Sequence, residues 1–230
     1  MKVLIAGDTH GAFWIGRVLA KADDIGADMA IVVGDCWDVH VRWEDRYRTP
    51  VKFVAGNHEQ PLFWEAGVAK GRCLEDYSTF TIGGVKFGVI GKIDQDNHEH
   101  LRESLPWLYD ALGPKPDIWM DKMPLVDASK LFYGVDVMLT HDGPSPMEFR
   151  DPEGMHRESG SKYLSDLLIE VKPKLLFHGH YHHQHTRRIG DTIAVGLDQQ
   201  MVKAAALSMI VLDTDSMSYA FVPHLSSAGV

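Results

Sequence analysis

KVLIAGDTHG (residues 2–11) is an apolar, β-branched run that ends in a turn carrying Asp8 and His10. Such a run predicts a buried strand with polar side chains at its carboxyl end. The residues that follow space their apolar side chains at roughly helical intervals. MAIVVGDCWD (29–38) then repeats the first pattern, with Asp35 after the strand. Together these segments predict a βαβ unit that brings the polar side chains to one edge of a sheet.

The same pattern of an apolar run followed by a polar motif recurs later in the chain. Runs at 51–54, 135–139 and 175–177 are followed by GNHE, THD and GHYH. The polar side chains at these strand ends are Asn57, His141, His180 and His182. Parallel strands in open α/β sheets place their sites at the carboxyl ends. We therefore expect these side chains to join those of the βαβ unit.

The rest of the pattern fits one α/β domain spanning residues 1–230. A helix is predicted over 161–171, and the tail from Gly190 alternates apolar and polar residues, which favours antiparallel strands of a second sheet. Residues 91–134 have a weaker pattern and are interpreted as a lid-like insertion. The 45% hydrophobic and 24% charged residues are typical of a globular protein.

Charge and cysteine content narrow the function classes. The 32 acidic against 23 basic residues argue against binding to a long nucleic acid, whose phosphates require a basic surface. The two cysteines do not form a disulfide framework, which favours a reducing, cytoplasmic setting. The first apolar run is too short to act as a signal sequence or to span a membrane. No feature of the sequence specifies an oligomeric state.

The polar side chains at the strand ends have the composition of a metal site. Carboxylate, amide and imidazole groups without thiolate suit hard or borderline divalent ions. A carboxylate at position 35, one strand away from Asp8, could bridge two ions about 3.5 to 4 Å apart. The seven candidate ligands are Asp8, His10, Asp35, Asn57, His141, His180 and His182.

The ordered motifs DxH, GDxxD, GNHE, THD and GHxH, between residues 8 and 182, resemble the calcineurin-like metallophosphoesterase family. The resemblance implies two mixed β-sheets sandwiched between helices and two divalent ions. Manganese is the expected metal, with iron, zinc and magnesium as alternatives. By the same resemblance Asp35 bridges the two ions. One ion is expected to bind Asp8, His10 and His182, and the other Asn57, His141 and His180.

The resemblance also implies a mechanism. A metal-bound hydroxide would attack the phosphorus, and His58 would protonate the leaving group as general acid. Asp38 matches an aspartate that hydrogen-bonds this histidine in the protein-phosphatase branch and is expected to orient it, with a solvated loop aspartate as the alternative. His178, His183 and His185 match no ligand of the family and are interpreted as histidines that do not bind metal.

This chain lacks the arginines that clamp phosphate in the protein-phosphatase branch of the family. Val39 and His40 follow Asp38, where the branch has Arg and Gly, and Gln60 and Pro61 follow Glu59, where it has Ser and Arg. Arg42, Arg46 and Arg48 lie close in sequence and could substitute for them, although a basic surface loop is the simpler interpretation. Because a diester carries one charge fewer than a monoester, the absence favours small phosphodiesters, including aryl diesters and cyclic nucleotides such as 2′,3′-cAMP.

Other interpretations remain open at this point. Trp14, Trp37 and Phe63 follow motif loops and could stack on a base, although buried core aromatics are more common, and no substrate-binding residue is assigned. The alternatives to a diesterase are a phosphomonoesterase or protein phosphatase, a non-catalytic scaffold with the same fold, and a metal-storage or sensing protein. The first two alternatives share the fold, so only the site can separate them.

Overall fold

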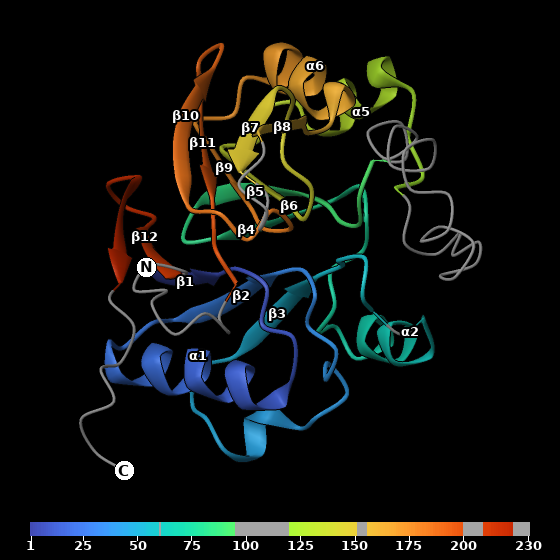
Figure 1. Cartoon of the computed structure of the whole chain (residues 1–230). Coiled ribbons are helices and arrows are strands. Elements are labelled where there is room, and N and C mark those ends of the chain that lie inside the picture. Colours follow the sequence, from blue (N-terminus) through green and yellow to red (C-terminus); the bar gives the residue numbers. More distant parts are fainter. Residues whose placement is uncertain (60, 95–119, 151–155, 200–208, 223–230) are drawn as a thin grey trace.

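The computed structural model describes residues 1–59, 61–94, 120–150, 156–199 and 209–222. Two mixed β-sheets lie face to face between helices, as the family resemblance implies (Figure 1). Helix α1 covers the outer face of one sheet, and helices α5 and α6 cover the outer face of the other. The predicted sandwich is therefore confirmed.

The first sheet has the strand order β13-β12-β1-β2-β3. Its strands are β1 (Lys2–Ala6), β2 (Met29–Val33), β3 (Val51–Val54), β12 (Met209–Asp213) and β13 (Ser218–Val222). Strand β1 pairs in parallel with β2 and antiparallel with β12. The two ends of the sequence thus meet in the middle of one sheet.

The second sheet has the strand order β10-β11-β9-β6-β5-β4. Its strands are β4 (Ser78–Ile82), β5 (Val85–Ile90), β6 (Val137–Thr140), β9 (Leu175–His178), β10 (His185–Ile189) and β11 (Thr192–Gly196). Its central strands β5, β6, β9 and β11 are parallel. A separate hairpin consists of β7 (Met147–Arg150) and β8 (His156–Ser159).

The helices bury one face each. They are α1 (Ala12–Asp24), α2 (Pro61–Ala69), α5 (Leu125–Leu131) and α6 (Lys162–Val171), with a 3-10 turn at Trp43–Asp45. Helix α6 starts where the Ser161 hydroxyl accepts a hydrogen bond from Leu164 N, a standard N-cap. The predicted helix over 161–171 is confirmed.

Alternation along the strands creates three apolar layers. Val3 and Ile5 of β1 face the second sheet, whereas Leu4 and Ala6 face α1. All four are fully buried, because a strand covered on both sides must be apolar at every position. Each fully buried aliphatic side chain of this kind contributes about 1.5–3 kcal/mol to stability. The layers fix the positions of the loops that follow the strands.

The tail corrects one expectation. The tail strands do pair antiparallel, β11 with β10 and β12 with both β1 and β13. They do not share one sheet, however, because β11 also pairs in parallel with β9 of the second sheet, while β12 and β13 join the first sheet. Strand β4 was not predicted from the sequence; it forms a tight hairpin with β5 through Gly83 and Gly84. Both glycines have positive φ, as a two-residue hairpin turn requires.

The range 91–134 is only partly described. Residues 95–119 lie outside the described part, so the lid-like insertion stays a prediction there. Helix α5, in contrast, packs against α6 and the outer face of the second sheet. Within the described residues, no helix has the length and apolar character needed to cross a membrane.

Candidate metal centre

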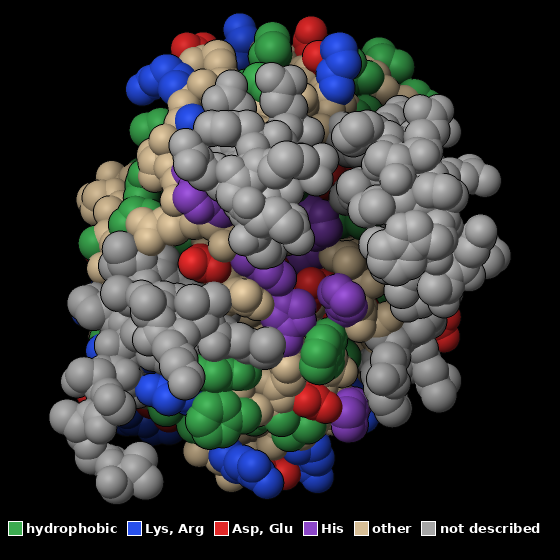
Figure 2. All heavy atoms as spheres, viewed as in Figure 1, with side chains coloured by type: hydrophobic (Ala, Val, Ile, Leu, Met, Phe, Trp, Pro, Cys, Tyr) green, Lys and Arg blue, Asp and Glu red, His purple; other side chains and the backbone are tan. Residues whose placement is uncertain are grey.

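The predicted site residues lie on loops that leave the carboxyl ends of parallel strands in both sheets. Asp8, Asp35 and Asn57 follow β1, β2 and β3 of the first sheet, while His141 and His180 follow β6 and β9 of the second. Figure 2 shows histidine side chains gathered in the middle of this face with acidic side chains among them. The two sheets therefore each contribute part of one polar cluster.

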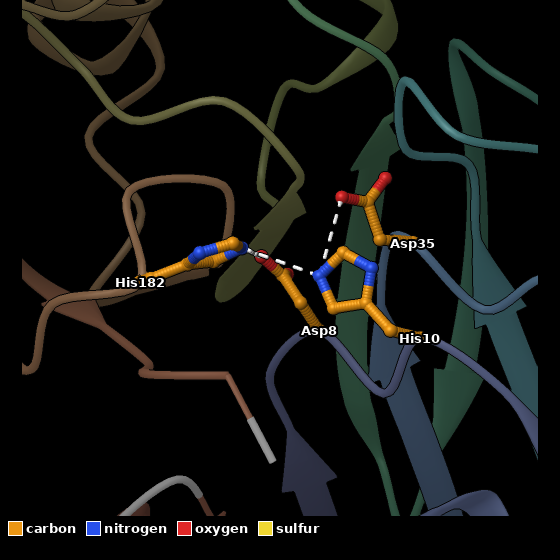
Figure 3. Close-up of side chains that lie close together, drawn as sticks. All are labelled: Asp8, His10, Asp35 and His182. Carbon is orange, nitrogen blue, oxygen red and sulfur yellow. Dashed lines mark hydrogen bonds and ion pairs between the residues drawn. The ribbon is translucent and has the colours of Figure 1, made fainter. Parts of the chain in front are cut away.

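Four of the candidate ligands form a compact group. The ligand atoms of Asp8, His10, Asp35 and His182 all lie within 4.8 Å of one another, and these side chains turn toward a common point (Figure 3). His182 Nε2 lies 3.0 Å from Asp8 Oδ2 and 3.3 Å from His10 Nε2. His10 Nε2 lies 3.8 Å from Asp35 Oδ2. A divalent ion at this point would have two carboxylates and two imidazoles available to it.

The other three candidates form a second group beside the first. Asn57 Oδ1 lies 2.9 Å from His141 Nε2 and 3.1 Å from His180 Nδ1. Asp35 Oδ1 lies 3.4 Å from His141 Nε2, while its other oxygen faces the first group. Asp35 is thus positioned between the two groups, as a bridging carboxylate must be.

Two observations indicate that this cluster fits cations. His141 Nδ1 donates to the carbonyl oxygen of Val33 at 3.1 Å, so a neutral ring presents the Nε2 lone pair to Asn57 Oδ1. Two acceptors that face each other need a proton or a cation between them. In addition, buried Asp8 Oδ1 has no hydrogen-bond partner among the described residues. A divalent ion would satisfy both conditions.

Burial and the nearby carboxylates shift the pKa values of the histidines in the cluster in opposite directions. Burial lowers the pKa of His141, but the carboxylates of Asp35 and Asp8 outweigh burial and leave the pKa raised. Burial likewise opposes the hydrogen bond and charge of Asp8 at His182, whose pKa is raised. At His10 burial dominates and the pKa is lowered. The site is thus negative enough to attract protons where no metal neutralises it.

Close backbone approach explains two of the motif glycines. A β-carbon at Gly34 would lie 1.9 Å from His141 Nδ1, and one at Gly179 would lie 2.0 Å from Asp8 Oδ1. In each case a loop of one sheet contacts a candidate ligand of the other. Any larger residue would therefore push the two halves of the cluster apart.

His58 and Asp38, the two predicted catalytic residues, differ in their surroundings. His58 Nε2 lies 4.0 Å from Asp35 Oδ2, and its side chain is 51% exposed. Asp38 Oδ2 instead accepts a hydrogen bond of 2.6 Å from Ala12 N, the first residue of α1. No hydrogen bond joins Asp38 to His58 within the described part of the chain. The orienting role of Asp38 therefore stays a prediction, and its observed contact fixes the loop after β1 to the loop after β2.

Glu59 is a buried residue of the site to which the sequence assigned no role. Its Oε1 accepts hydrogen bonds from Cys36 N and Gly56 N, both at 3.0 Å. Burial, followed by the charge of Asp35, raises the pKa of Glu59 to about 7. Glu59 thus joins the loops that carry Asp35 and Asn57. The GNHE motif contained a signal for this local contact, because Glu59 lies three residues after Gly56, from whose N–H it accepts a hydrogen bond.

Replacing Glu59 tests this bridge. We expect Glu59→Ala to lower the free energy of unfolding by about 2–4 kcal/mol, because two buried N–H groups lose their acceptor. Manganese affinity should fall about 10- to 100-fold, as for other residues that orient metal ligands. Glu59→Gln is the matched control: its amide oxygen can accept both hydrogen bonds, so it should retain most of both quantities. Urea unfolding and metal titration measure them, and equal losses in both variants would contradict the bridge.

A tyrosine and an aspartate connect the second-sheet loops. Tyr181, between the two histidines of GHYH, donates a hydrogen bond of 2.6 Å to Asp142 Oδ1, next to His141. Burial raises the pKa of Asp142 to about 6 despite this hydrogen bond. Of the histidines that match no ligand, His178 is fully buried and its Nε2 lies 3.3 Å from His185 Nε2. Burial lowers the pKa of His178 to about 3, which suits a neutral structural histidine.

Two of the three arginines in the loop after β2, Arg42 and Arg48, contact groups outside the cluster. Arg42 forms ion pairs with Glu44 and Asp45, and Arg48 donates to the carbonyl oxygen of Asp23. Lys and Arg side chains in Figure 2 lie toward the edges of the face rather than beside the histidines. These contacts do not support the idea that Arg42 and Arg48 replace the missing phosphate clamp.

The fold and the site define an α/β sandwich with a histidine–carboxylate cluster at the carboxyl ends of its strands. A sequence model described as calcineurin-like phosphoesterase matches residues 1–184. The chain belongs to the calcineurin-like phosphoesterase family. Two-metal hydrolysis of phosphate esters uses a cluster of this composition, in which a shared carboxylate holds the ions together.

Several known proteins are similar over most of this chain. An uncharacterised protein of Haemophilus influenzae is 22% identical over 217 residues, which cover 81% of this chain and 85% of that protein. A hypothetical protein from Thermus thermophilus aligns with a TM-score of 0.55 and 12% identity, covering 97% of this chain and 98% of the other. A putative 5′-nucleotidase from Staphylococcus aureus aligns with a TM-score of 0.50 and 15% identity, covering 99% of this chain and 55% of the nucleotidase. At these identities the solved structures support the fold alone.

Proposed function

We propose that this protein hydrolyses small phosphodiesters with the help of two divalent metal ions. The observation that carries the proposal is the position of Asp35 between two groups of candidate ligands. Substrates of this class include aryl diesters and cyclic nucleotides such as 2′,3′-cAMP. Bound at such a site, two divalent ions would lower the pKa of a water molecule and stabilise charge on the phosphoryl oxygens.

Two sets of residues would each bind one of the ions. Asp8, His10 and His182 would hold one ion, and Asn57, His141 and His180 the other, with Asp35 shared. The hydrogen bond from His141 Nδ1 to Val33 O keeps the Nε2 lone pair directed into the cluster. The backbone N–H of His180 donates to Asp8 Oδ2 at 3.0 Å and fixes that carboxylate. Manganese is the metal we propose, because mixed imidazole and carboxylate ligands suit it.

His58 is the proposed general acid. Its backbone N–H donates to Asp35 Oδ1 at 3.0 Å, which holds the loop, while its ring remains half exposed beside the cluster. From this position Nε2 could hold a proton and deliver it to the oxygen of a leaving alkoxide. Histidine is suited to the role because its usual pKa is near neutrality.

Two considerations favour diesters over monoesters. The dianion of a monoester gains most from cationic side chains, and Arg42 and Arg48 contact Asp45 and the carbonyl oxygen of Asp23 instead of residues of the cluster. A diester monoanion has less to gain from such a clamp. A monoesterase remains the principal alternative, and comparing an aryl diester with the matching aryl monoester in the presence of manganese separates the two.

Substitution of His58 tests its role and the proposed reaction together. We expect His58→Ala to slow hydrolysis of 2′,3′-cAMP by about 10²- to 10⁴-fold, because its leaving alkoxide requires a proton. Hydrolysis of bis(p-nitrophenyl) phosphate should fall far less, since p-nitrophenolate leaves without protonation. Steady-state kinetics of wild type, His58→Ala and His58→Gln measure the difference.

The His58 experiment has a control variant and three results that would contradict the proposal. Replacement of His183, an exposed histidine outside both ligand groups, should leave both rates within about twofold. An equal loss on both substrates in His58→Ala would contradict the general acid. Preference for the aryl monoester would replace the diesterase proposal by a monoesterase, and no turnover of any ester by wild type with manganese would favour a scaffold.

The scaffold alternative has a structural parallel. GAP50 of Plasmodium, described as an anchor in the inner membrane complex, has a similar fold, with a TM-score of 0.50 and 11% identity. The alignment covers 99% of this chain and 90% of GAP50.

A further inference from the structure

Trp37 is an exposed aromatic side chain beside the candidate metal centre. Its side chain is 41% exposed, whereas Trp43 a few residues later is 3% exposed. A single exposed aromatic residue is common on protein surfaces, and Phe13 and Tyr133 are more exposed still. A role for Trp37 therefore has to be argued from the groups that surround its ring.

The indole is held by groups of the site itself. Its centroid lies 5.2 Å from that of His10, with the two rings nearly perpendicular, and 6.2 Å from that of His58. A β-carbon at Gly11 would lie 3.9 Å from Trp37 Cε3, so the ring also packs near the backbone of the first motif. These contacts hold the indole between a candidate metal ligand and the proposed general acid while much of its surface remains exposed.

The backbone adopts an unfavourable conformation to place the ring there. Trp37 has a φ of 53°, in the left-handed region that bulky side chains rarely adopt. Such outliers concentrate at functional sites, where the surrounding structure holds them in place. Here Asp38 N donates to Cys36 O at 2.7 Å and closes the tight turn around Trp37. The turn therefore directs the indole toward the cluster rather than into the core.

We propose that Trp37 is a specificity-determining residue that stacks on an aromatic ring of the substrate, such as a nucleobase. The proposal rests on the proposed phosphodiesterase activity and deepens it. Arg42 and Arg48 contact other groups, and stacking would add affinity for the substrate that does not depend on a guanidinium group. Stacking on an indole provides affinity without charge and tolerates different bases, because every base has a π-face.

The test compares two cyclic diesters with the same reacting group. Adenosine 2′,3′-cyclic phosphate carries a base, and methyl riboside 2′,3′-cyclic phosphate carries a methoxy group in its place. With wild type and manganese, we expect a lower KM for the adenosine compound. Trp37→Ala should raise that KM about tenfold and change kcat/KM for the base-free compound less than twofold. Trp37→Phe should retain most of the preference.

A matched control lies at the other end of the strands. Tyr133 is 82% exposed and lies just before β6 begins, opposite to the site, so Tyr133→Ala should leave both substrates unchanged. Equal losses on both substrates in Trp37→Ala would overturn the proposal, because Trp37 would then only support His10 and His58. The same follows if wild type does not distinguish the two compounds.

A binding measurement separates this proposal from the proposed activity. If wild type hydrolyses neither compound, the phosphodiesterase proposal fails, but calorimetry with adenosine 3′-phosphate and inorganic phosphate still tests Trp37. We expect Trp37→Ala to weaken binding of the nucleotide about tenfold and to leave phosphate binding unchanged. An unchanged dissociation constant for the nucleotide would overturn the stacking role.

Discussion

Asp35→Asn should reduce kcat/KM for an aryl phosphodiester by roughly a thousandfold, because a shared carboxylate supports several kcal/mol of two-metal stabilisation. Its two oxygens face different ligand groups, with Oδ1 3.4 Å from His141 Nε2 and Oδ2 3.8 Å from His10 Nε2. An amide offers neither the charge nor the second oxygen. Metal analysis after dialysis should show fewer than two bound ions per chain.

The metal-free form of this variant should fold at least as well as wild type. The amide oxygen introduced by Asp35→Asn can still accept the hydrogen bond that His58 N gives to Asp35 Oδ1 at 3.0 Å. The substitution also removes the charge of Asp35, which after burial is the second cause of the raised pKa of Glu59. Asp136→Asn, at the far end of β6, is the matched control and should keep turnover within about twofold. Two tightly bound ions and normal turnover in Asp35→Asn would show that Asp35 does not bridge.

Manganese should stabilise the metal-stripped protein strongly. Each ion bound at one hundred times its dissociation constant adds about 2.7 kcal/mol, so two ions add about 5 kcal/mol. For a chain of this length the melting temperature should rise by about 10–20 °C. The physical reason is that a cation would satisfy the buried Asp8 Oδ1, which accepts no hydrogen bond from the described residues, and the facing acceptors of Asn57 and His141. Differential scanning calorimetry with and without manganese measures the shift.

Loss of one of the two ligand groups should reduce the rise in melting temperature that manganese causes. Asn57→Ala removes the amide oxygen shared by His141 and His180, so about half of the manganese-induced shift should remain. Turnover of an aryl diester should disappear on metal removal and return on addition of manganese. A melting temperature that does not respond to manganese, with all candidate ligands intact, would be incompatible with a metal centre.

Much of the architecture could be predicted because the determining signals are local. Each apolar run that ends in a polar motif did become a buried strand, and the strand ends brought Asp8 and Asp35 near His182. The helix at 161–171 was visible from its spacing and its stop at Pro173. These features depend on periodicity and on residues that terminate elements, both of which are present in short stretches of sequence.

The features that were missed depend on long-range partners. Alternation in the tail predicted antiparallel pairing, which β12 shows with β1 and β13, but it did not reveal that β11 also pairs in parallel with β9 or that β12 joins the first sheet. Alternation reports that one face is buried, not which strand lies next to it. For Glu59 the GNHE motif signals the local hydrogen bond from Gly56 N, but the second hydrogen bond, from Cys36 N, becomes visible only when β2 and β3 lie side by side.

The central position of β1 has a consequence for how the protein folds. Lys2 pairs with Asp213, so the strand that leads into Asp8 completes its pairing only after a segment from the far end of the sequence arrives. Contacts of such large sequence separation form slowly, because closing a long loop costs chain entropy. The strand before Asp8 should therefore be consolidated late in folding. Metal ions present at the start of refolding would find the candidate ligands only partly ordered. Tight metal binding should therefore lag behind the formation of helical structure in a refolding experiment.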